Sequence, residues 1–199
     1  MSKVKSYAAL RADKPLNPYE INRREINSDD VNIDILYCGV CHSDIHMARN
    51  EWNNTSIYPM VPGHEIIGIV KEVGSDVSKF KVGDNVGVGV YVDACEKCEN
   101  CNSGKDHYCE EGIVLTYNSY EYGTRNITYG GYSKSIVVKE NYVIKVPSDM
   151  DMAKAAPLLC AGITTYSPLR HFKINSNHKV GIAGLGGLGH MGLKFASSF

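Results

Sequence analysis

The spacing of four cysteines restricts the fold of this chain more than any other feature. Cys95, Cys98, Cys101 and Cys109 follow the pattern C-x2-C-x2-C-x7-C within fifteen residues. A two-residue gap lets two thiolates face one ion from a tight turn, and four such soft ligands match a closed tetrahedral zinc site. Because four thiolates leave no coordination position open, we expect this zinc to be structural.

The same cysteines are compatible with other chemistry. Disulfides, free thiols and an iron–sulfur cluster all remain open, and His107 lies inside the loop as a competing ligand. The first ten residues lack the apolar core of a signal peptide, so we expect a cytoplasmic, reducing location. Disulfides are disfavoured in such a compartment, which makes structural zinc the favoured interpretation.

The charge balance bears on the class of partner. The chain has 21 basic and 22 acidic residues, for a net charge of −1, which gives no electrostatic case for nucleic acid or an anionic membrane surface. No apolar run approaches the ~18 residues of a membrane span. We therefore expect a small-molecule partner, with no nucleic acid and no membrane.

Residues 1–150 are typical of a β-rich domain. Val31, Ile33 and Ile35 alternate with polar residues, which is the period-2 pattern of a half-buried strand. Other segments combine β-branched residues with bounding glycine or proline and predict further strands. These segments are residues 68–73, 82–90, 135–139 and 142–146.

The pattern changes after residue 150. Residues 152–156 predict a short helix, and residues 179–183 predict a short apolar strand. A glycine-rich run follows at once, and Leu188, Met191 and Phe195 then recur at helical spacing. A strand, a glycine loop and a helix in that order indicate the beginning of a second, α/β domain.

A second set of candidate metal ligands is dispersed along the chain. The run Cys41-His42-Ser43-Asp44-Ile45-His46 combines a thiol, two imidazoles, a hydroxyl and a carboxylate. Gly63-His64-Glu65 adds another imidazole and carboxylate, and Cys160 is an isolated thiol. Spacing alone does not join these groups, since a single histidine or cysteine is more often packed than ligating.

Several motifs together resemble the zinc-containing medium-chain alcohol dehydrogenases. They are the cysteine quartet, Cys38-Gly-Val-Cys-His-Ser-Asp-Ile-His46, Pro62-Gly-His-Glu-Ile-Ile-Gly68 and Gly184-Leu-Gly-Gly-Leu-Gly-His190. Two further runs are similar to the cinnamyl alcohol dehydrogenase branch. These are Tyr58-Pro-Met-Val-Pro-Gly-His-Glu65 and Ala156-Pro-Leu-Leu-Cys-Ala-Gly162.

The resemblance implies a mixed α/β fold in two parts. Residues 1–150 would form a GroES-like β-barrel catalytic domain, and residues 151–199 the start of a truncated Rossmann nucleotide-binding domain. The activity implied is the interconversion of primary alcohols and aldehydes by hydride transfer with NADP, the preferred cofactor, or NAD. For a full-length member we expect a homodimer.

The resemblance also implies roles for matching residues. Cys41, His64 and Cys160 would hold a catalytic zinc, which makes two zinc ions per chain. Glu65 would lie beside that metal, and Asp44 would orient His64. The proton would leave through Ser43 and His46. Ser43 as a turn hydroxyl and His42 as a surface residue remain simpler alternatives.

The cofactor is expected at the glycine loop. The loop has the pattern G-x-G-x-x-G after an expected strand and before a helix, which suits a pyrophosphate, although a ligand-free turn remains possible. Thr164 would contact the nicotinamide and His42 the phosphates, both by resemblance. The loop residues are Gly184, Leu185, Gly186, Gly187, Leu188 and Gly189.

Two features leave the function open at this stage. Leu115 stands where many plant members of the branch carry a tryptophan in the substrate pocket, which argues against a lignin-type substrate. The glycine loop lies close to Phe199, so most of a cofactor domain is missing from this sequence. A non-catalytic, zinc-stabilised GroES-like module or an inactive truncated fragment is therefore the alternative to an enzyme.

Overall fold

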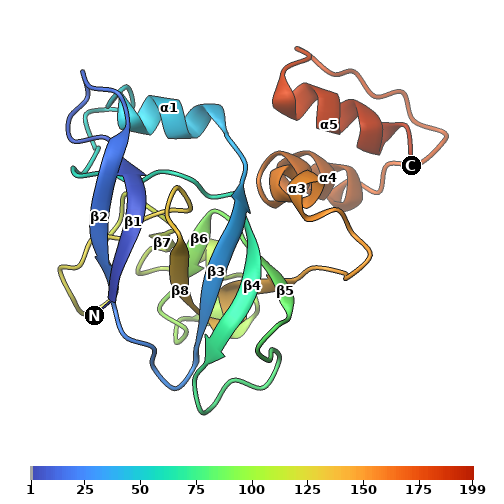
Figure 1. The fold of residues 1–199 in the computed structure, drawn as a ribbon. Helices are drawn as coiled ribbons and strands as arrows, with labels where there is room; N and C mark the ends of the chain where they lie inside the picture. Colours follow the sequence, from blue (N-terminus) through green and yellow to red (C-terminus); the bar gives the residue numbers. More distant parts are fainter. Residues whose placement is uncertain (1) are drawn as a thin grey trace.

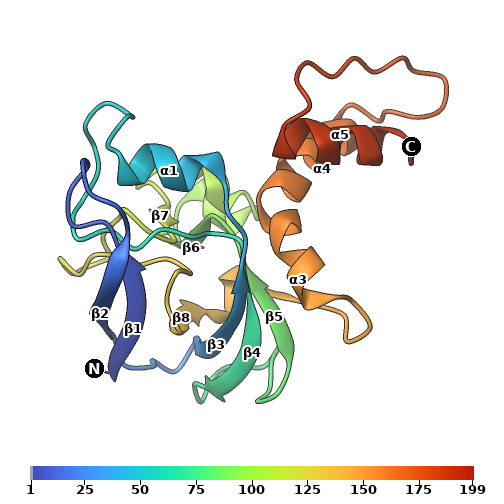
Figure 2. The same cartoon turned by 45° about the horizontal axis from the view of Figure 1, so that its top comes forward.

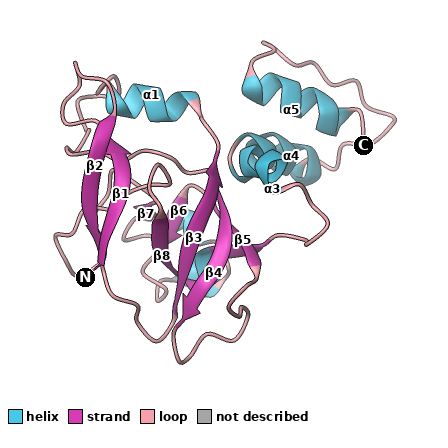
Figure 3. Cartoon of the chain, viewed as in Figure 1, coloured by secondary structure: helices cyan, strands magenta, loops and turns pink. Residues whose placement is uncertain are grey.

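The computed structural model describes residues 2–199 and is organised around a curled antiparallel sheet (Figures 1 and 3). This sheet has five strands in the order β8-β3-β4-β5-β9. The strand β3 confirms the predicted alternation, because its residues Val31 and Ile33 point into the core and are fully buried. The strands are β3 (Asp30–Cys38), β4 (Ile66–Val73), β5 (Asn85–Val88), β8 (Ser135–Lys139) and β9 (Val143–Lys145).

Two smaller antiparallel sheets complete the β-rich part. β1 (Ser2–Ala8) pairs with β2 (Asn17–Arg23), and β6 (Tyr91–Asp93) pairs with β7 (Val114–Leu115). The backbone N–H of Tyr7 donates to the Tyr132 carbonyl, which ties the β1–β2 hairpin to the rest of the domain. Figure 2 shows the curled arrangement of the labelled strands, which is that of a GroES-like half-barrel.

Helices lie at the ends of the sheet and after it. α1 (His42–Ala48) lies across one end of the strands, and α2 (Glu99–Asn102) with η1 (Asp106–Tyr108) belongs to the cysteine loop. The short helix η2 (Glu140–Tyr142) connects β8 to β9. After β9 the chain continues through α3 (Met152–Ala155), η3 (Ala156–Leu159) and α4 (Ala161–His171). The predicted helix over residues 152–156 is thus confirmed with a slightly earlier end.

The last helix, α5 (Gly187–Ala196), packs beside α4. The ring of Tyr166 meets that of Phe195 edge-on, with centroids 5.3 Å apart. Figures 1 and 2 show this pair of helices set to one side of the curled sheet. The helix predicted from Leu188, Met191 and Phe195 is confirmed.

The predicted strand over residues 179–183 is wrong. This segment joins no sheet in the described residues and belongs to no strand. The physical reason is that a strand is held by hydrogen bonds to a neighbour, and no strand lies beside this segment in residues 2–199. The chain therefore shows the helices and loop of an incomplete Rossmann unit without its sheet. None of the helices in this range has the length and hydropathy to cross a bilayer.

Candidate metal centres and cofactor loop

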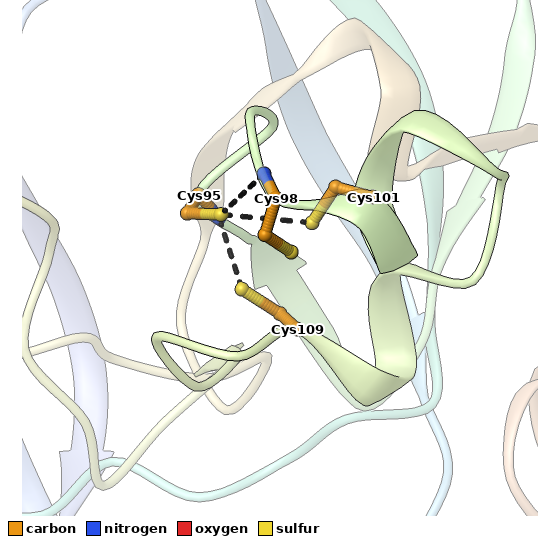
Figure 4. A group of neighbouring side chains, drawn as sticks. All are labelled: Cys95, Cys98, Cys101 and Cys109. Atoms are coloured by element: carbon orange, nitrogen blue, oxygen red, sulfur yellow. Dashed lines mark hydrogen bonds between the residues drawn. The ribbon is translucent and has the colours of Figure 1, made fainter.

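The four cysteines of the quartet converge on one point (Figure 4). The sulfurs of Cys95, Cys98, Cys101 and Cys109 all lie within 4.8 Å of one another, and Cys95 Sγ is 3.8 Å from Cys101 Sγ. Disulfide sulfurs would be separated by about 2.05 Å. With Zn–S bonds of about 2.3 Å, a regular tetrahedron of sulfurs has edges of about 3.8 Å. The donor set and its spacing fit a four-thiolate zinc ion.

Hydrogen bonds to sulfur support this arrangement. The backbone N–H of Cys98 donates to Cys95 Sγ at 3.4 Å, and the N–H of Cys95 points to Cys109 Sγ at 3.4 Å. The hydroxyl of Tyr122 lies 3.8 Å from Cys109 Sγ. Such contacts stabilise sulfur in its thiolate form. His107 is outside the group of converging ligands, and its ring instead lies tilted against that of Tyr108, with centroids 4.2 Å apart.

The dispersed ligands form a second cluster. Cys41 precedes α1, His64 precedes β4 and Cys160 precedes α4, yet their ligand atoms and a Glu65 oxygen lie within 4.8 Å of one another. Cys41 Sγ and Cys160 Sγ are 3.9 Å apart. That distance again matches the edge of a zinc tetrahedron, about 3.8 Å. Two sulfurs and one imidazole nitrogen are a donor set that suits zinc with a fourth position open.

Asp44 connects two of the ligand-bearing segments. Its Oδ2 accepts the backbone N–H of Cys41 at 3.0 Å, and its Oδ1 accepts the N–H of Gly63 at 2.9 Å. Oδ1 also lies 3.1 Å from His64 Nδ1. Asp44 is the third residue of α1, where a carboxylate that bonds back to the residue before the helix also caps it. This leaves Nε2 of His64 for a metal.

The charges of this cluster favour a cation. Burial alone would lower the pKa of His64, but the Asp44 carboxylate and the Cys160 thiol outweigh burial and raise it to about 11. Burial would raise the pKa of Cys41, but hydrogen bonds from Ser43 and the charge of His64 lower it. Both shifts have the same cause, which is the attraction between a positive charge and the anionic groups of Asp44 and the two cysteines, and these anionic groups would also attract a divalent metal.

Glu65 lies against the same cluster and is 3 % exposed. Burial raises the pKa of its carboxyl group. A Cβ atom at Gly39 would lie 1.9 Å from Glu65 Oε2, so only glycine at that position leaves room for the carboxylate. The backbone at Gly39 therefore leaves space for the Glu65 carboxylate beside the candidate metal cluster.

The predicted relay residues lie on α1. Ser43 Oγ is 3.5 Å from Cys41 Sγ, and His46 lies one turn further along the helix. The ring of His46 stacks between those of His42 and Trp52, with centroids 4.5 and 5.2 Å away. Among the described residues, no hydrogen bond joins Ser43 directly to His46. The sequence analysis missed Glu51, whose carboxylate contacts His46 Nδ1 at 2.5 Å, because ordinary polar loops contain such residues.

The glycine loop has the backbone its pattern predicts. Gly184 has φ of +84°, and a Cβ at Gly189 would lie 1.9 Å from the Gly184 carbonyl oxygen, so both positions require glycine. Gly186 precedes α5 and offers no side-chain cap to its first N–H groups. Those free donors suit a phosphate. Gly187 begins α5, and Leu185 beside it is 72 % exposed.

Thr164 lies close to this loop. A pocket of about 300 Å³ between α4 and the loop is lined by Thr164, Leu188 and Gly189 among others. The structure thus places Thr164 beside the glycine loop. His42 is exposed and is the first residue of α1, directly after Cys41.

Comparison with known proteins decides the family. Residues 27–148 match the family described as "Alcohol dehydrogenase GroES-like domain". The chain belongs to this family. As a member, it is 53% identical over its whole length to "NADP-dependent alcohol dehydrogenase C 1" of Mycolicibacterium smegmatis, and covers 56% of that protein. It is also 53% identical to "Probable cinnamyl alcohol dehydrogenase 5" of Oryza sativa subsp. japonica, with 96% of this chain and 54% of the relative covered.

Solved structures of alcohol dehydrogenases agree. The cinnamyl alcohol dehydrogenase of Helicobacter pylori, solved with NADP(H), superimposes with a TM-score of 0.95 at 49% identity, covering 98% of this chain and 56% of the other. One from Sorghum bicolor gives 0.95 at 45% identity, covering 99% and 56%. These matches confirm the resemblance to the cinnamyl branch. The chain spans about half the length of the relatives it matches.

Proposed function

We propose that this chain forms the zinc-binding catalytic half of an NADP(H)-dependent alcohol dehydrogenase that interconverts primary alcohols and aldehydes. The observation that carries the proposal is the convergence of Cys41, His64 and Cys160. In sequence, 23 residues separate the first two and 96 the last two. Ordinary packing gives no reason for two thiols and an imidazole to face one point with zinc-like spacing.

The chain's own residues supply the frame for the chemistry. A zinc ion in this cluster would act as a Lewis acid that lowers the pKa of an alcohol. Cys41, His64 and Cys160 would hold it and leave one position for the substrate oxygen. The two thiolates offset the charge of the ion, and Asp44 holds His64 in the tautomer that presents Nε2. Glu65 keeps a carboxylate within reach of the open position.

Proton movement is assigned to α1. The hydroxyl of Ser43 lies beside the sulfur of Cys41, and the side chain of His46 is about one-third exposed. One imidazole nitrogen can accept a proton while the other donates one, so His46 suits the step that passes a proton to solvent. We propose that the alcohol proton leaves through Ser43 and then His46.

The cofactor is proposed at Gly184–Gly189. The free N–H groups at the start of α5 would bind the pyrophosphate, Thr164 would contact the nicotinamide, and His42 would contact a phosphate. The preference for NADP is supported by the names of the relatives. The residue that selects NADP over NAD is expected about 20 positions after the loop. A homodimer and a cytoplasmic location complete the proposal.

Metal content is the first test, and activity is the second. We expect two zinc ions per chain by elemental analysis, one lost in Cys98→Ser and the other in Cys160→Ser. A polypeptide of the relatives' length that carries this sequence should oxidise NADPH with primary aldehydes, whereas residues 1–199 alone should be inactive or nearly so. A chain that binds one zinc, lost in Cys98→Ser, would instead be a non-catalytic zinc-stabilised module.

A further inference from the structure

Tyr132 contacts the candidate metal cluster through Asp44. Its phenol hydroxyl donates to Asp44 Oδ2 at 3.1 Å. The same carboxylate accepts the N–H groups of Cys41 and Gly63 and faces His64 Nδ1. A carboxylate offers about four lone-pair directions, which these four donors can fill, and the Tyr117 hydroxyl also faces Asp44. Asp44 is 3 % exposed, and water therefore has little access to replace a lost donor.

The loop that carries Tyr132 is pressed against the loop that carries His64. The N–H of Gly131 donates to the Gly63 carbonyl at 2.8 Å, and the N–H of Tyr132 donates to the Pro62 carbonyl at 3.0 Å. A Cβ at Gly130 would lie 2.4 Å from the Gly63 oxygen, so the two backbones meet only because no side chain intervenes. Tyr132 is thus placed by the same contacts that hold the histidine loop.

A buried arginine fixes this loop from its other side. Arg23, on β2, donates from Nη1 to the Tyr129 carbonyl at 2.7 Å and from Nε to the Ser135 carbonyl at 2.9 Å. Its Nη2 reaches the Gly130 carbonyl and the Ser133 hydroxyl at 3.1 and 2.8 Å. A guanidinium that bridges four acceptors leaves the loop little freedom. These contacts hold the phenol oxygen of Tyr132 beside Asp44.

We infer that Tyr132 is a positioning residue for His64, acting through the Asp44 carboxylate. The hydroxyl fills one acceptor direction of Asp44 and prevents that carboxylate from rotating. Asp44 in turn sets the ring plane of His64. Without the hydroxyl, one buried lone pair is unpaired and the carboxylate can turn toward another donor. This inference rests on the proposed function, because it needs Cys41, His64 and Cys160 to hold a metal.

The test is Tyr132→Phe, which removes one oxygen and keeps the ring. The readout is the rate at which the zinc-loaded chain transfers metal to a colorimetric chelator, with the two release phases assigned by Cys98→Ser and Cys160→Ser. We expect release from the Cys41–His64–Cys160 cluster to be about 10-fold faster, at the lower end of the range for outer partners of metal ligands. Cobalt(II) at that cluster should also show shifted absorption bands.

Tyr122→Phe is the matched control, because the Tyr122 hydroxyl lies beside Cys109 of the quartet. We expect it to change the quartet phase and leave the other phase at the wild-type rate. In an Asp44→Asn background, Tyr132→Phe should change release less than twofold. A Tyr132→Phe chain that melts earlier but releases both metals at wild-type rates would overturn the inference, as would equal acceleration of both phases.

A second substitution covers the case in which Tyr132→Phe does not fold. Replacing Tyr132 by 3-fluorotyrosine keeps the ring and makes the hydroxyl a stronger donor. Slower metal release from the Cys41–His64–Cys160 cluster supports the inference, and an unchanged or faster rate overturns it. Failure of the proposed function is distinct, because then the wild-type chain itself would bind only the quartet zinc.

Discussion

Cys41 Sγ and Cys160 Sγ lie 3.9 Å apart although 119 residues separate them in the chain. The first sulfur stands at the start of α1 and the second immediately before α4, so the pair joins the β-rich domain to the helices that follow it. A metal between them would cross-link these two parts.

Cys98→Ser should remove the quartet zinc and destabilise the β-rich domain. The loop from Cys95 to Cys109 has little apolar core of its own, so metal binding supplies much of its folding free energy. We expect a loss of about 3–5 kcal/mol, or roughly 10–15 °C in melting temperature for a chain of this size. Calorimetry and metal analysis check this. Unchanged zinc content would contradict it, and Cys38→Ala is a control outside both clusters.

Cys160→Ser should remove the second metal and leave the quartet zinc in place. Because a metal held by Cys41, His64 and Cys160 would link α4 to the β-rich domain, its loss should loosen α4 more than the sheet. Hydrogen exchange should therefore rise over α4 and stay constant over β3 and β4. Equal exchange in α4 with and without the metal would show that the link carries no stability.

Cys38 should make stability fall at high pH. Burial raises the pKa of its thiol to about 12, against about 8.5 in an unfolded chain. Between these values the folded chain keeps a proton that the unfolded chain releases, so the contribution is complete below about pH 8.5 and is lost as pH rises toward 12. Urea unfolding of the zinc-loaded chain should show that the free energy of unfolding of Cys38→Ala declines less between pH 8 and 10 than that of the wild type. Parallel curves for the two proteins would refute this.

Gly131→Ala should destabilise the chain by about 1–3 kcal/mol, the usual cost of overpacking a core. A Cβ there would lie 2.4 Å from Ile66 Cγ1 and 2.7 Å from Cys38 Sγ. Gly181→Ala is the matched control, since a Cβ at that position meets nothing within 4 Å. Equal melting temperatures for the two variants would contradict the prediction, because the loop that carries Tyr132 would then accommodate the added methyl group without loss of stability.

Part of the fold was predictable because local patterns express it. Val31 and Ile33 alternate with polar residues along the sequence, and the structure confirms the strand that this pattern predicts. β1 was missed because its inward positions include Ser6 and Ala8, which carry almost no apolar signal. α1 was missed because seven residues are too few for a helical period to show. The strand expected over residues 179–183 was wrong because pairing depends on a neighbour.

The sequence by itself determined the cysteine quartet, since four ligands within fifteen residues meet whenever one loop closes. It also determined the glycine loop, whose backbone follows from what glycine permits. Only the tertiary structure decided that Cys41, His64 and Cys160 share one centre. The number of residues between two ligands does not define their distance in space when the strands of a sheet lie between them in the sequence. The contact of Tyr132 with Asp44 has the same origin, because two glycine-bearing loops must first pack together.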